Sequence, residues 1–418
     1  MHNYLLIKNG RVIDLTNNID AKLDILIKDG IIDSVAPNIF QKDATIIDAS
    51  NLIITPGLID VHTHFREPGE EQKEDIRTGS RAALAGGFTS VICEPNTQPR
   101  IDNSDILKKV ITRGKEVGLI NLYSSACITT GDKHNKLTDI KDLKDSGATM
   151  FTDDGDPVIY PELMQKALVE AQKNKTMLSP HCESSGWAES ITGKLNEEPE
   201  IFYVKRDIEL VKKTNASLHF AHISLEESLN AIRIAKSKGL NITCEVTPHH
   251  LVLDKSFEKK YGTLTKVNPA LRKISDVKAM QEGLLDGTID VIASDHAPHT
   301  KADKDSVWEK AACGMIGIET SLGVLLSELV HKNIIPLNTL IAKLTCNPAN
   351  IFNLPAGKLT PGMPADITII DLNKEWTVDA NKFESKSRNC PFDKWELKGK
   401  PVMTIVKGKV KMKDGVVI

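Results

Sequence analysis

The chain has 418 residues and a formal net charge of −3, so its length suits one large domain with a smaller appendage. The charge gives no electrostatic case for a nucleic-acid or anionic-membrane partner. The first residues lack a basic region followed by a long apolar run, and apolar runs elsewhere are short, so we expect neither a signal peptide nor a membrane span. Seven scattered cysteines without a Cys-x-x-Cys pair predict reduced thiols in a cytoplasmic protein.

β-Rich runs separated by turn signals begin and end the chain. Asn9-Gly10 and Asp29-Gly30 each lie between such runs, and both dipeptides are strong hairpin signals. Near the other end, residues 366–370 are strand-like and Asp414-Gly415 marks a further turn. We therefore expect the two ends of the chain to pair in one small β-domain.

The middle of the chain, residues 55–345, alternates short apolar strands with helical stretches. In the helical stretches, apolar residues recur at mixed three- and four-residue spacing. This alternation predicts an α/β fold with a (β/α)8 TIM-type barrel, to which residues 1–54 and 346–418 add a small β-sandwich domain. The strands expected are Leu58–His64, Thr89–Asn96, Asn121–Ile128, Ala148–Asp154, Thr176–Glu183, Ser217–Ser224, Asn241–His250 and Asp290–His299. The helical stretches include Glu74–Ala85, Ser104–Val117, Tyr160–Asn174, Leu225–Ser237 and Asp276–Leu285.

Polar residues of the expected barrel gather at the C-terminal ends of its strands, which in this fold form one mouth where catalysis takes place. Five strands deliver imidazole or carboxylate groups there, a pattern that packing alone does not explain. The residues are His62, His64, Asp153, Asp154, His181, His219, His222, Asp295, His296 and His299.

His62 and His64 lie two residues apart on one strand, so both side chains point to the same face. Two imidazoles on one face, with carboxylates nearby, suit Zn²⁺. The spacing alone is a weak signal, because His-x-His occurs by chance in many chains and such a pair is often only hydrogen-bonded to its neighbours. The surrounding run, Thr55-Pro56-Gly57-Leu58-Ile59-Asp60-Val61-His62-Thr63-His64, favours the metal-binding interpretation.

That run resembles the opening signature of the amidohydrolase superfamily, and the residues after it resemble class I bacterial dihydroorotases. Further matches follow in the family's order over essentially the whole chain. They include His64-Phe65-Arg66-Glu67-Pro68-Gly69, Pro95-Asn96-Thr97, Phe151-Thr152-Asp153-Asp154-Gly155, Cys244-Glu245-Val246-Thr247-Pro248-His249-His250, Val267-Asn268-Pro269-Ala270-Leu271-Arg272, Ser294-Asp295-His296-Ala297-Pro298-His299 and Gly362-Met363-Pro364-Ala365-Asp366.

The resemblance implies a metal centre with one or two Zn²⁺ ions per subunit. The ligands it implies are His62, His64 and Asp295 for one metal and His181 and His222 for a second. Many relatives bridge the metals with a carboxylated lysine on strand four, but this sequence has Asp153-Asp154 there, like dihydroorotases that use an aspartate bridge. We choose Asp154 as the bridging ligand and keep Asp153 as the alternative.

The resemblance also implies a reaction, the reversible interconversion of dihydroorotate and N-carbamoyl-L-aspartate in de novo pyrimidine (UMP) biosynthesis. Metal-activated water attacks the ring amide, and Asp295 carries the proton to the leaving nitrogen. The substrate carboxylate needs a fixed cation, for which Arg66 offers a planar fork; the alternative for Arg66 is a surface ion pair with Glu67 or Glu70. The substrate-binding residues implied are Arg66, Asn96 and His299 for the carboxylate, Asn268 for the ring amide, and Cys313 and Gly314 for backbone hydrogen bonds to the ring.

Other polar residues receive structural interpretations. We expect His219 to be a packed strand residue, and His249 and His250 to make hydrogen bonds outside the metal ligands. His296 is expected to support Asp295 or to line the mouth. The charged run Lys301–Lys310 is expected to be a solvated loop, and its place directly after His299 makes it a candidate active-site lid.

Three functions stay open from the sequence: an active dihydroorotase, another cyclic amidohydrolase such as a hydantoinase or allantoinase, and an inactive dihydroorotase-like scaffold of aspartate transcarbamoylase. Arg66, Asn96 and the absent lysine argue against the second. The complete set of metal ligands argues against the third, although residues 184–216 form a shorter segment than the family leads us to expect. For partners, the resemblance implies a small-molecule substrate and either a homodimer or a complex with aspartate transcarbamoylase.

Overall fold

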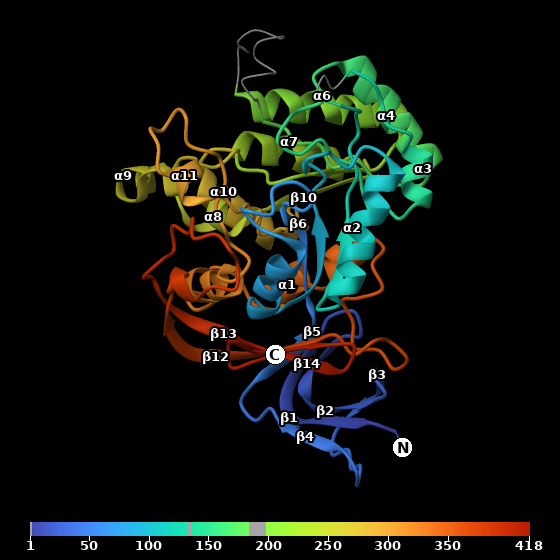
Figure 1. Cartoon of the computed structure of the whole chain (residues 1–418), viewed down its shortest axis with the longest axis vertical. Helices are drawn as coiled ribbons and strands as arrows, with labels where there is room; N and C mark the ends of the chain where they lie inside the picture. Colours follow the sequence, from blue (N-terminus) through green and yellow to red (C-terminus); the bar gives the residue numbers. More distant parts are fainter. Residues whose placement is uncertain (1, 132–134, 184–197) are drawn as a thin grey trace.

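The computed structural model describes residues 2–131, 135–183 and 198–418. Figure 1 shows a large sheet at the bottom of the view, with both chain ends beside it, and a mixed body of strands and helices above it. The blue strands that start the chain and the red strands that end it lie side by side in this sheet.

The large sheet has nine strands in the order β15-β14-β13-β12-β5-β1-β2-β3, with β4 paired to β1. β5 joins the two ends of the chain, because it pairs in parallel with β1 and antiparallel with β12. A cluster of buried side chains from both ends packs here, including Ile7, Ile25, Ile54, Ile367 and Ile405. The strands are β1 (Tyr4–Asp14), β2 (Ile19–Lys28), β3 (Ile31–Ala36), β4 (Thr45–Asp48), β5 (Ile53–Pro56), β12 (Ile367–Thr377), β13 (Glu396–Val406), β14 (Lys409–Lys413) and β15 (Val416–Val417).

Of the three predicted turns in this sheet, two form and one is a β-bulge. Asp29-Gly30 connects β2 to β3 and Asp414-Gly415 connects β14 to β15, both with positive φ angles, so these two turn predictions are confirmed. The hairpin predicted at Asn9-Gly10 is wrong. These residues lie inside β1, where the register against β2 shifts between Ile7 and Gly10 and Asn9 has a φ of 67°, which is the pattern of a β-bulge.

Parallel pairings link the remaining strands in a ring. One three-stranded sheet is β6-β7-β8 and another is β9-β10-β11. Isolated parallel bridges connect them through Phe151 and Leu178 on one side, and Thr63 pairs with His296 on the other. The strands are β6 (Leu58–Thr63), β7 (Phe88–Cys93), β8 (Asn121–Ser124), β9 (Leu218–Phe220), β10 (Ile242–Val246) and β11 (Val291–Ile292).

The strands expected at residues 148–154 and 176–183 are wrong as full-length strands, because each contributes only a bridge to the ring. The reason is visible beside the first of them. The Asp153 carboxylate accepts the backbone N–H groups of Ile128 and Thr129, so these amides are not available to a longer ladder.

The strand expected at residues 241–250 is also too long. β10 ends at Val246, and helix α8 (Pro248–Val252) follows directly. The Thr247 side chain accepts the N–H of His250 as an N-cap, and proline suits the first position of a helix. A proline two residues after the end of a strand therefore starts a helix here.

Helices cover the outside of the ring, and their apolar faces join its strands in one large buried cluster. The five helical stretches predicted from periodicity are present, and each end lies within two residues of its predicted position. The helices are α1 (Ile76–Ala85), α2 (Ser104–Val117), α3 (Ile140–Asp145), α4 (Pro161–Lys173), α6 (Pro199–Thr214), α7 (Glu226–Ser237), α8, α9 (Glu258–Tyr261), α10 (Ile274–Leu285), α11 (Lys301–Lys304), α12 (Ser321–Leu325), α13 (Leu337–Leu344) and α14 (Cys346–Ile351).

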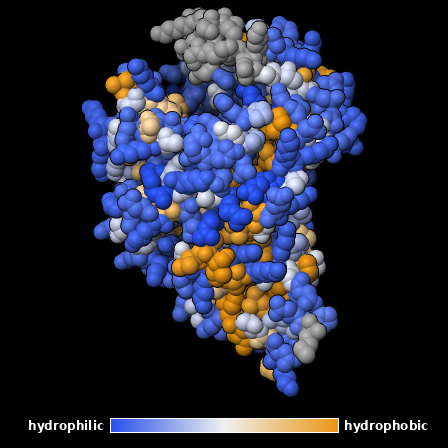
Figure 2. All heavy atoms as spheres, viewed as in Figure 1, coloured by the Kyte–Doolittle hydropathy of each residue, from blue (hydrophilic) through white to orange (hydrophobic). Residues whose placement is uncertain are grey.

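On the face that Figure 2 shows, the surface is mostly polar over the body that holds these helices. Figure 2 shows a band of hydrophobic surface in the lower half of the same view, where the large sheet lies in Figure 1. Within the described residues, none of the helices has the length and apolar character needed to cross a membrane.

Candidate metal and substrate site

A cavity of about 450 Å³ lies at one end of the parallel ring. Its lining residues follow strand ends: His64 comes after β6, His222 after β9 and Asp295 after β11. Every residue predicted for the metal and substrate sites lines this cavity except His62, whose Nε2 lies 3.3 Å from the lining residue Asp154. The full lining is His64, Arg66, Asn96, Asp154, Gly155, His181, His222, Asn268, Asp295, Ala297, His299, Cys313 and Gly314.

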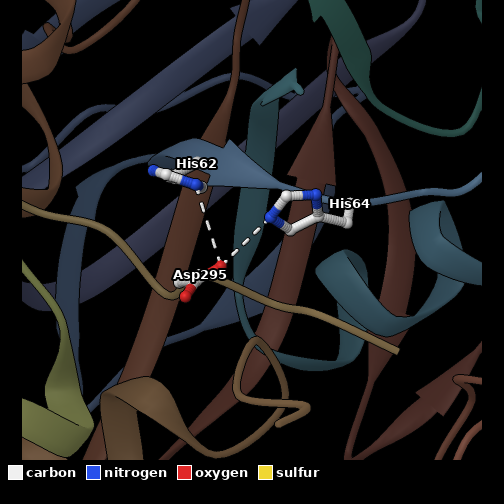
Figure 3. A group of neighbouring side chains, drawn as sticks. All are labelled: His62, His64 and Asp295. Carbon is white, nitrogen blue, oxygen red and sulfur yellow. Dashed lines mark hydrogen bonds and ion pairs between the residues drawn. The ribbon is translucent and has the colours of Figure 1, made fainter. Parts of the chain in front are cut away.

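Figure 3 shows His62, His64 and Asp295 converging from β6 and from the segment after β11. The Asp295 Oδ1 atom lies 3.1 Å from His64 Nε2 and 3.7 Å from His62 Nε2. All three side chains are buried. Asp295 has a φ of 46°, a left-handed conformation that a non-glycine residue adopts at an energetic cost and that is frequent at functional sites.

A second group lies on the other side of His62. The Asp154 Oδ1 atom is 3.3 Å from His62 Nε2 and 3.5 Å from both His222 Nε2 and His181 Nδ1. Its Oδ2 atom is 3.5 Å from His64 Nε2. The Asp154 carboxylate therefore lies between the imidazoles of both groups, the position that a bridging ligand needs.

Asp153 has a different environment. Its carboxylate accepts hydrogen bonds from the Arg100 guanidinium and the Thr129 hydroxyl, in addition to two backbone amides. The side chain is 1% exposed and is absent from the cavity lining. Of the two neighbouring aspartates, Asp154 is the one that the fold brings to the histidines.

Two buried glutamates that the sequence did not single out surround His62. Glu245 on β10 accepts the Nδ1–H of His62 at 2.7 Å and lies 3.2 Å from His219 Nε2. Glu94, directly after β7, is 3% exposed and accepts a hydrogen bond from Ser125. The signal that would have found both is the one used for the histidines, because each is a polar residue at a buried strand end.

His219 is packed in the strand, as predicted, and bonds to Thr243 and Glu245. His250 bonds to Thr247 and to the Pro269 carbonyl, as predicted. The same prediction is not confirmed for His249, because its buried Nε2 has no hydrogen-bond partner among the described residues. The expectation that His296 supports Asp295 or lines the mouth is wrong, because His296 is absent from the cavity lining. Its ring lies near Glu74 and the Gly317 amide instead.

The electrostatics of the site favour charged carboxylates. Burial alone would raise the pKa of Asp154, but His62, His181 and His222 lower it well below its usual range. Burial likewise acts to raise the pKa of Asp295, but its 3.1 Å contact with His64 Nε2, together with the charge of His62, lowers it below its usual range. Both carboxylates are therefore anionic at neutral pH.

The pKa values of His62 and His64 shift in opposite directions. Burial acts to lower the pKa of His62, but the charges of Glu94, Asp154 and Glu245 raise it well above its usual value. Burial lowers the pKa of His64, which favours the neutral imidazole that a metal needs. The surrounding carboxylates thus favour the charged form of His62, whereas burial favours the neutral form of His64.

The predicted carboxylate-binding residues meet on the cavity wall. Arg66 is 8% exposed, its Nε donates to the Pro298 carbonyl, and one terminal nitrogen lies 3.4 Å from His299 Nε2. The His299 Nε2–H donates to the Cys313 carbonyl at 2.8 Å. Burial, with the charges of Arg66 and Lys73, lowers the pKa of His299 to about 3. A buried guanidinium and a neutral imidazole therefore lie side by side. The alternative ion pair with Glu70 is also present, because Arg66 Nη1 lies 4.0 Å from Glu70 Oε2, but Arg66 is buried rather than at the surface.

Two asparagines on the wall contact the histidines. Asn96 accepts from His64 Nδ1 at 3.0 Å and donates to Asp154 Oδ2 at 3.1 Å. Asn268 Nδ2 lies 3.1 Å from His181 Nε2. Asn96 thus fixes which His64 nitrogen faces Asp154, a contact that the sequence did not predict.

Two expectations about loops change. The run Lys301–Lys310 is not wholly solvated, because it begins with helix α11 and Lys304 is 2% exposed. The shortened stretch 184–216 lies only partly within the described residues, because 184–197 are outside them. Its described part contains helix α6, whose Glu200 accepts hydrogen bonds from Ser224 and Leu225.

The donor set fits a divalent metal. Two groups, His62-His64-Asp295 and His62-Asp154-His222, each have ligand atoms within 4.8 Å of one another. His62 Nε2 is buried and has no hydrogen-bond partner among the described residues, while Glu245 holds Nδ1. An imidazole nitrogen left without a partner and aimed at two carboxylates is what a bound cation would use.

The amidohydrolase family profile matches residues 53–411 of this chain. Because this match covers most of the chain, the protein belongs to the amidohydrolase family. Among solved structures, an L-hydantoinase from Arthrobacter aurescens aligns with a TM-score of 0.89 and 26% identity, covering 100% of this chain and 98% of that one. A dihydropyrimidinase from Brevibacillus agri aligns with a TM-score of 0.83 at 22% identity, covering 100% and 96%, which shows a shared fold.

Relatives found by sequence have a higher identity to this chain than these solved structures. A dihydroorotase from Citrifermentans bemidjiense is 44% identical over 97% of this chain and 99% of its own length. A dihydroorotase from Acetivibrio thermocellus is 41% identical over 99% of this chain and 100% of its own length. Within the amidohydrolase family the chain therefore groups with the dihydroorotases, and it is a hydrolase.

Proposed function

We propose that this chain interconverts dihydroorotate and N-carbamoyl-L-aspartate, the reaction of dihydroorotases in pyrimidine (UMP) biosynthesis. One observation carries the proposal. A buried cation, Arg66, lies on the wall of a cavity whose floor gathers three histidines and two aspartates. That combination suits a cyclic amide that bears a carboxylate, because the guanidinium recognises the carboxylate while the floor acts on the amide.

The metal in this proposal is Zn²⁺, with one or two ions per subunit. His62, His64 and Asp295 would hold one ion, His181 and His222 the other, and Asp154 would bridge them. When bound, such ions polarise a carbonyl and lower the pKa of water. The lining of the described cavity contains no lysine, so the bridge proposed here is a side-chain carboxylate.

The chain's own residues supply binding and proton transfer. Asp295, anionic and at the cavity surface, accepts the proton of the attacking water and donates it to the leaving ring nitrogen. Arg66, Asn96 and His299 bind the substrate carboxylate. Asn268 binds the ring amide, and the Cys313–Gly314 backbone binds the ring. In the biosynthetic direction the same proton moves back through Asp295.

The fold that supports this site is proposed as a (β/α)8 barrel over residues 55–345, with residues 1–54 and 346–418 forming a small β-sandwich domain. The closed succession of parallel pairings and the nine-stranded sheet shared by both ends support this division. A cytoplasmic location is proposed because all seven cysteines are free thiols and six of them are buried.

For partners, we propose a homodimer, with assembly onto aspartate transcarbamoylase as the second arrangement to test. Light scattering of the purified chain, alone and mixed with aspartate transcarbamoylase from the same source, distinguishes them by mass. A monomer in both measurements would contradict both arrangements.

A spectrophotometric assay tests the activity. Purified chain is supplied with dihydroorotate, hydantoin or allantoin, before and after treatment with a chelator and after addition of Zn²⁺. We expect turnover of dihydroorotate that chelation abolishes and Zn²⁺ restores, with far slower turnover of the other two substrates. Faster hydantoin turnover would instead make the chain a hydantoinase. No turnover by zinc-replete protein would leave the inactive-scaffold alternative.

A further inference from the structure

Two lysines converge on one loop of the cavity wall, residues 308–314. Lys266 Nζ donates to the carbonyls of Trp308, Glu309 and Ala311 at 2.6 to 3.2 Å. Lys304 Nζ donates to the carbonyls of three further residues at 2.8 to 3.2 Å. Those residues are Lys266, Ala312 and Gly314. Five of the six carbonyls belong to the loop, so its peptide planes are held by side chains rather than by a helix or a strand.

Lys304 is the less accessible of the two lysines. Its residue is 2% exposed, and a buried ammonium is costly unless all its N–H groups find partners. The three carbonyls satisfy its three donors. Among the described residues, the Lys304 ammonium donates to neither a carboxylate nor the side chain of a cavity residue, so it serves the backbone of this loop.

The direction of one peptide follows from this clamp. In a trans peptide the C=O and the N–H point in opposite directions. Because the Ala312 carbonyl points to Lys304, which does not line the cavity, the Cys313 N–H points to the other side. Cys313 lines the cavity.

The other polar backbone groups of this turn are already used. The Cys313 carbonyl accepts from His299, and the Gly314 N–H donates to the Lys266 carbonyl. The Gly314 carbonyl accepts from Lys304 and Asn389. The Cys313 N–H has no partner among the described residues, which leaves it as the donor that this wall offers to a ligand.

We propose that Lys304 is a positioning residue for substrate recognition: it fixes the Ala312–Cys313 peptide so that the Cys313 N–H donates to an acceptor oxygen of the substrate ring. The proposal rests on the function proposed above. It also changes the interpretation of the 301–310 run, which acts as a fixed support behind the wall rather than as a lid.

The test compares Lys304→Met with Lys301→Met in zinc-replete protein. Methionine keeps the length of the side chain and removes the donors, and Lys301 lies in the same helix with 90% of its side chain exposed. We expect Lys304→Met to raise the KM for dihydroorotate about tenfold, the effect of one lost hydrogen bond to substrate. kcat should change less than about threefold, and zinc content should be unchanged. Lys301→Met should match the parent protein.

Amide hydrogen exchange gives a second readout that does not depend on turnover. Dihydroorotate should slow exchange of the Cys313 amide in the parent chain and should not slow it in Lys304→Met. If Lys304→Met does not fold, Lys266→Met replaces it, because Lys266 is more exposed and holds the same loop; its KM should also rise.

Several results would overturn the proposal. They are an unchanged KM, a Cys313 amide that dihydroorotate leaves unprotected in an active parent chain, or a Lys304→Met variant that loses zinc and kcat together. A parent chain that fails to turn over dihydroorotate would instead reject the proposed function itself.

Discussion

Asp153 and Asp154 are adjacent in the sequence, but their side chains lie in different environments in the structure. Asp153 ends in a buried network with Arg100 and Thr129, while Asp154 faces the histidines across the cavity floor. The sequence located the pair at a strand end but did not choose between them by its own pattern; the family resemblance favoured Asp154. The choice depends on which way each side chain leaves the backbone, and that is set by contacts from distant segments.

Alanine substitutions should separate the two roles. Asp154→Ala should remove most of the bound zinc and activity while leaving the Tm within a few degrees of the parent. Asp153→Ala should keep more zinc but lose stability, on the order of 2–3 kcal/mol, because it leaves the partly buried Arg100 without this carboxylate. Metal analysis by mass spectrometry and thermal unfolding of both variants provide the measurements. Greater zinc loss in Asp153→Ala would reverse the assignment.

Glu245 acts on a proposed ligand without lining the cavity. It accepts from His62 Nδ1 and from the His222 backbone N–H, so its charge keeps His62 Nε2 directed at Asp154 and Asp295. Glu245→Gln should weaken zinc affinity about 10- to 100-fold, the usual effect of losing such a partner. Competition with a chromophoric chelator measures this affinity. Glu282→Gln, an exposed change on α10, is the control, and equal affinities for both variants would contradict the prediction.

Gly314 is required by its surroundings. Its φ is 131°, and a Cβ there would lie 2.7 Å from the Ala297 Cβ and 3.0 Å from His299 Nε2. Gly314→Ala should therefore displace His299 and raise the KM for dihydroorotate about tenfold or more, through the lost contact to the carboxylate. Gly362→Ala is a matched control, because Gly362 also has a positive φ but nothing within 4 Å of the added Cβ. A raised KM in both variants would show that backbone strain, rather than His299, is responsible.

At the scale of elements, periodicity was a good guide to helices and a poor guide to strand lengths. The amphipathic stretches that became α1, α2, α4, α7 and α10 have three to four turns, enough for the apolar stripe to be unambiguous. The strands of the ring are short, and their pairing is decided by neighbours. Asp153 illustrates this point, because its side chain takes two amides that a longer ladder would have used.

Whether a turn dipeptide reverses the chain also depends on the strand that pairs with it. Asn9-Gly10 and Asp29-Gly30 have the same turn chemistry, and both place their first residue at positive φ. Only Asp29-Gly30 reverses the chain, because β2 continues to pair with β1 on both sides of Asn9-Gly10 and turns the dipeptide into a bulge. Local sequence specifies the φ angles, whereas the partner strand decides between a hairpin and a bulge.

At the scale of the whole molecule, the grouping of the candidate residues in one cavity was predictable. A ring of parallel strands brings strand ends together, so residues far apart in sequence can be assigned to one place from their position alone. The supports of the site were not predictable in this way. Asn389, from the C-terminal part of the chain, accepts the His299 N–H and donates to the Ala297 and Gly314 carbonyls. Lys304 and Glu245 act through backbone groups or through other side chains, and no spacing rule in the sequence reports such contacts.

The C-terminal segment is attached to the body by a partly buried acid, and this attachment should depend on pH. Glu319 accepts the backbone N–H groups of Glu384 and Ser385, and burial raises the pKa of its carboxyl from 4.5 to about 8. Between these two pH values the folded chain holds a proton that the unfolded chain releases. The contribution to stability is therefore complete below about pH 4.5 and is lost as pH rises through 8.

Glu319→Gln keeps this position neutral at every pH. Its Tm should fall less than that of the parent between pH 6 and pH 9, by a difference on the order of 2 °C for a chain of this size. Thermal unfolding of both proteins over this range, with Glu282→Gln as the control for a lost surface charge, checks the prediction. Parallel Tm profiles for the parent and Glu319→Gln would mean that the Glu319 carboxyl is already ionised in the folded chain, held by the two amides that it accepts.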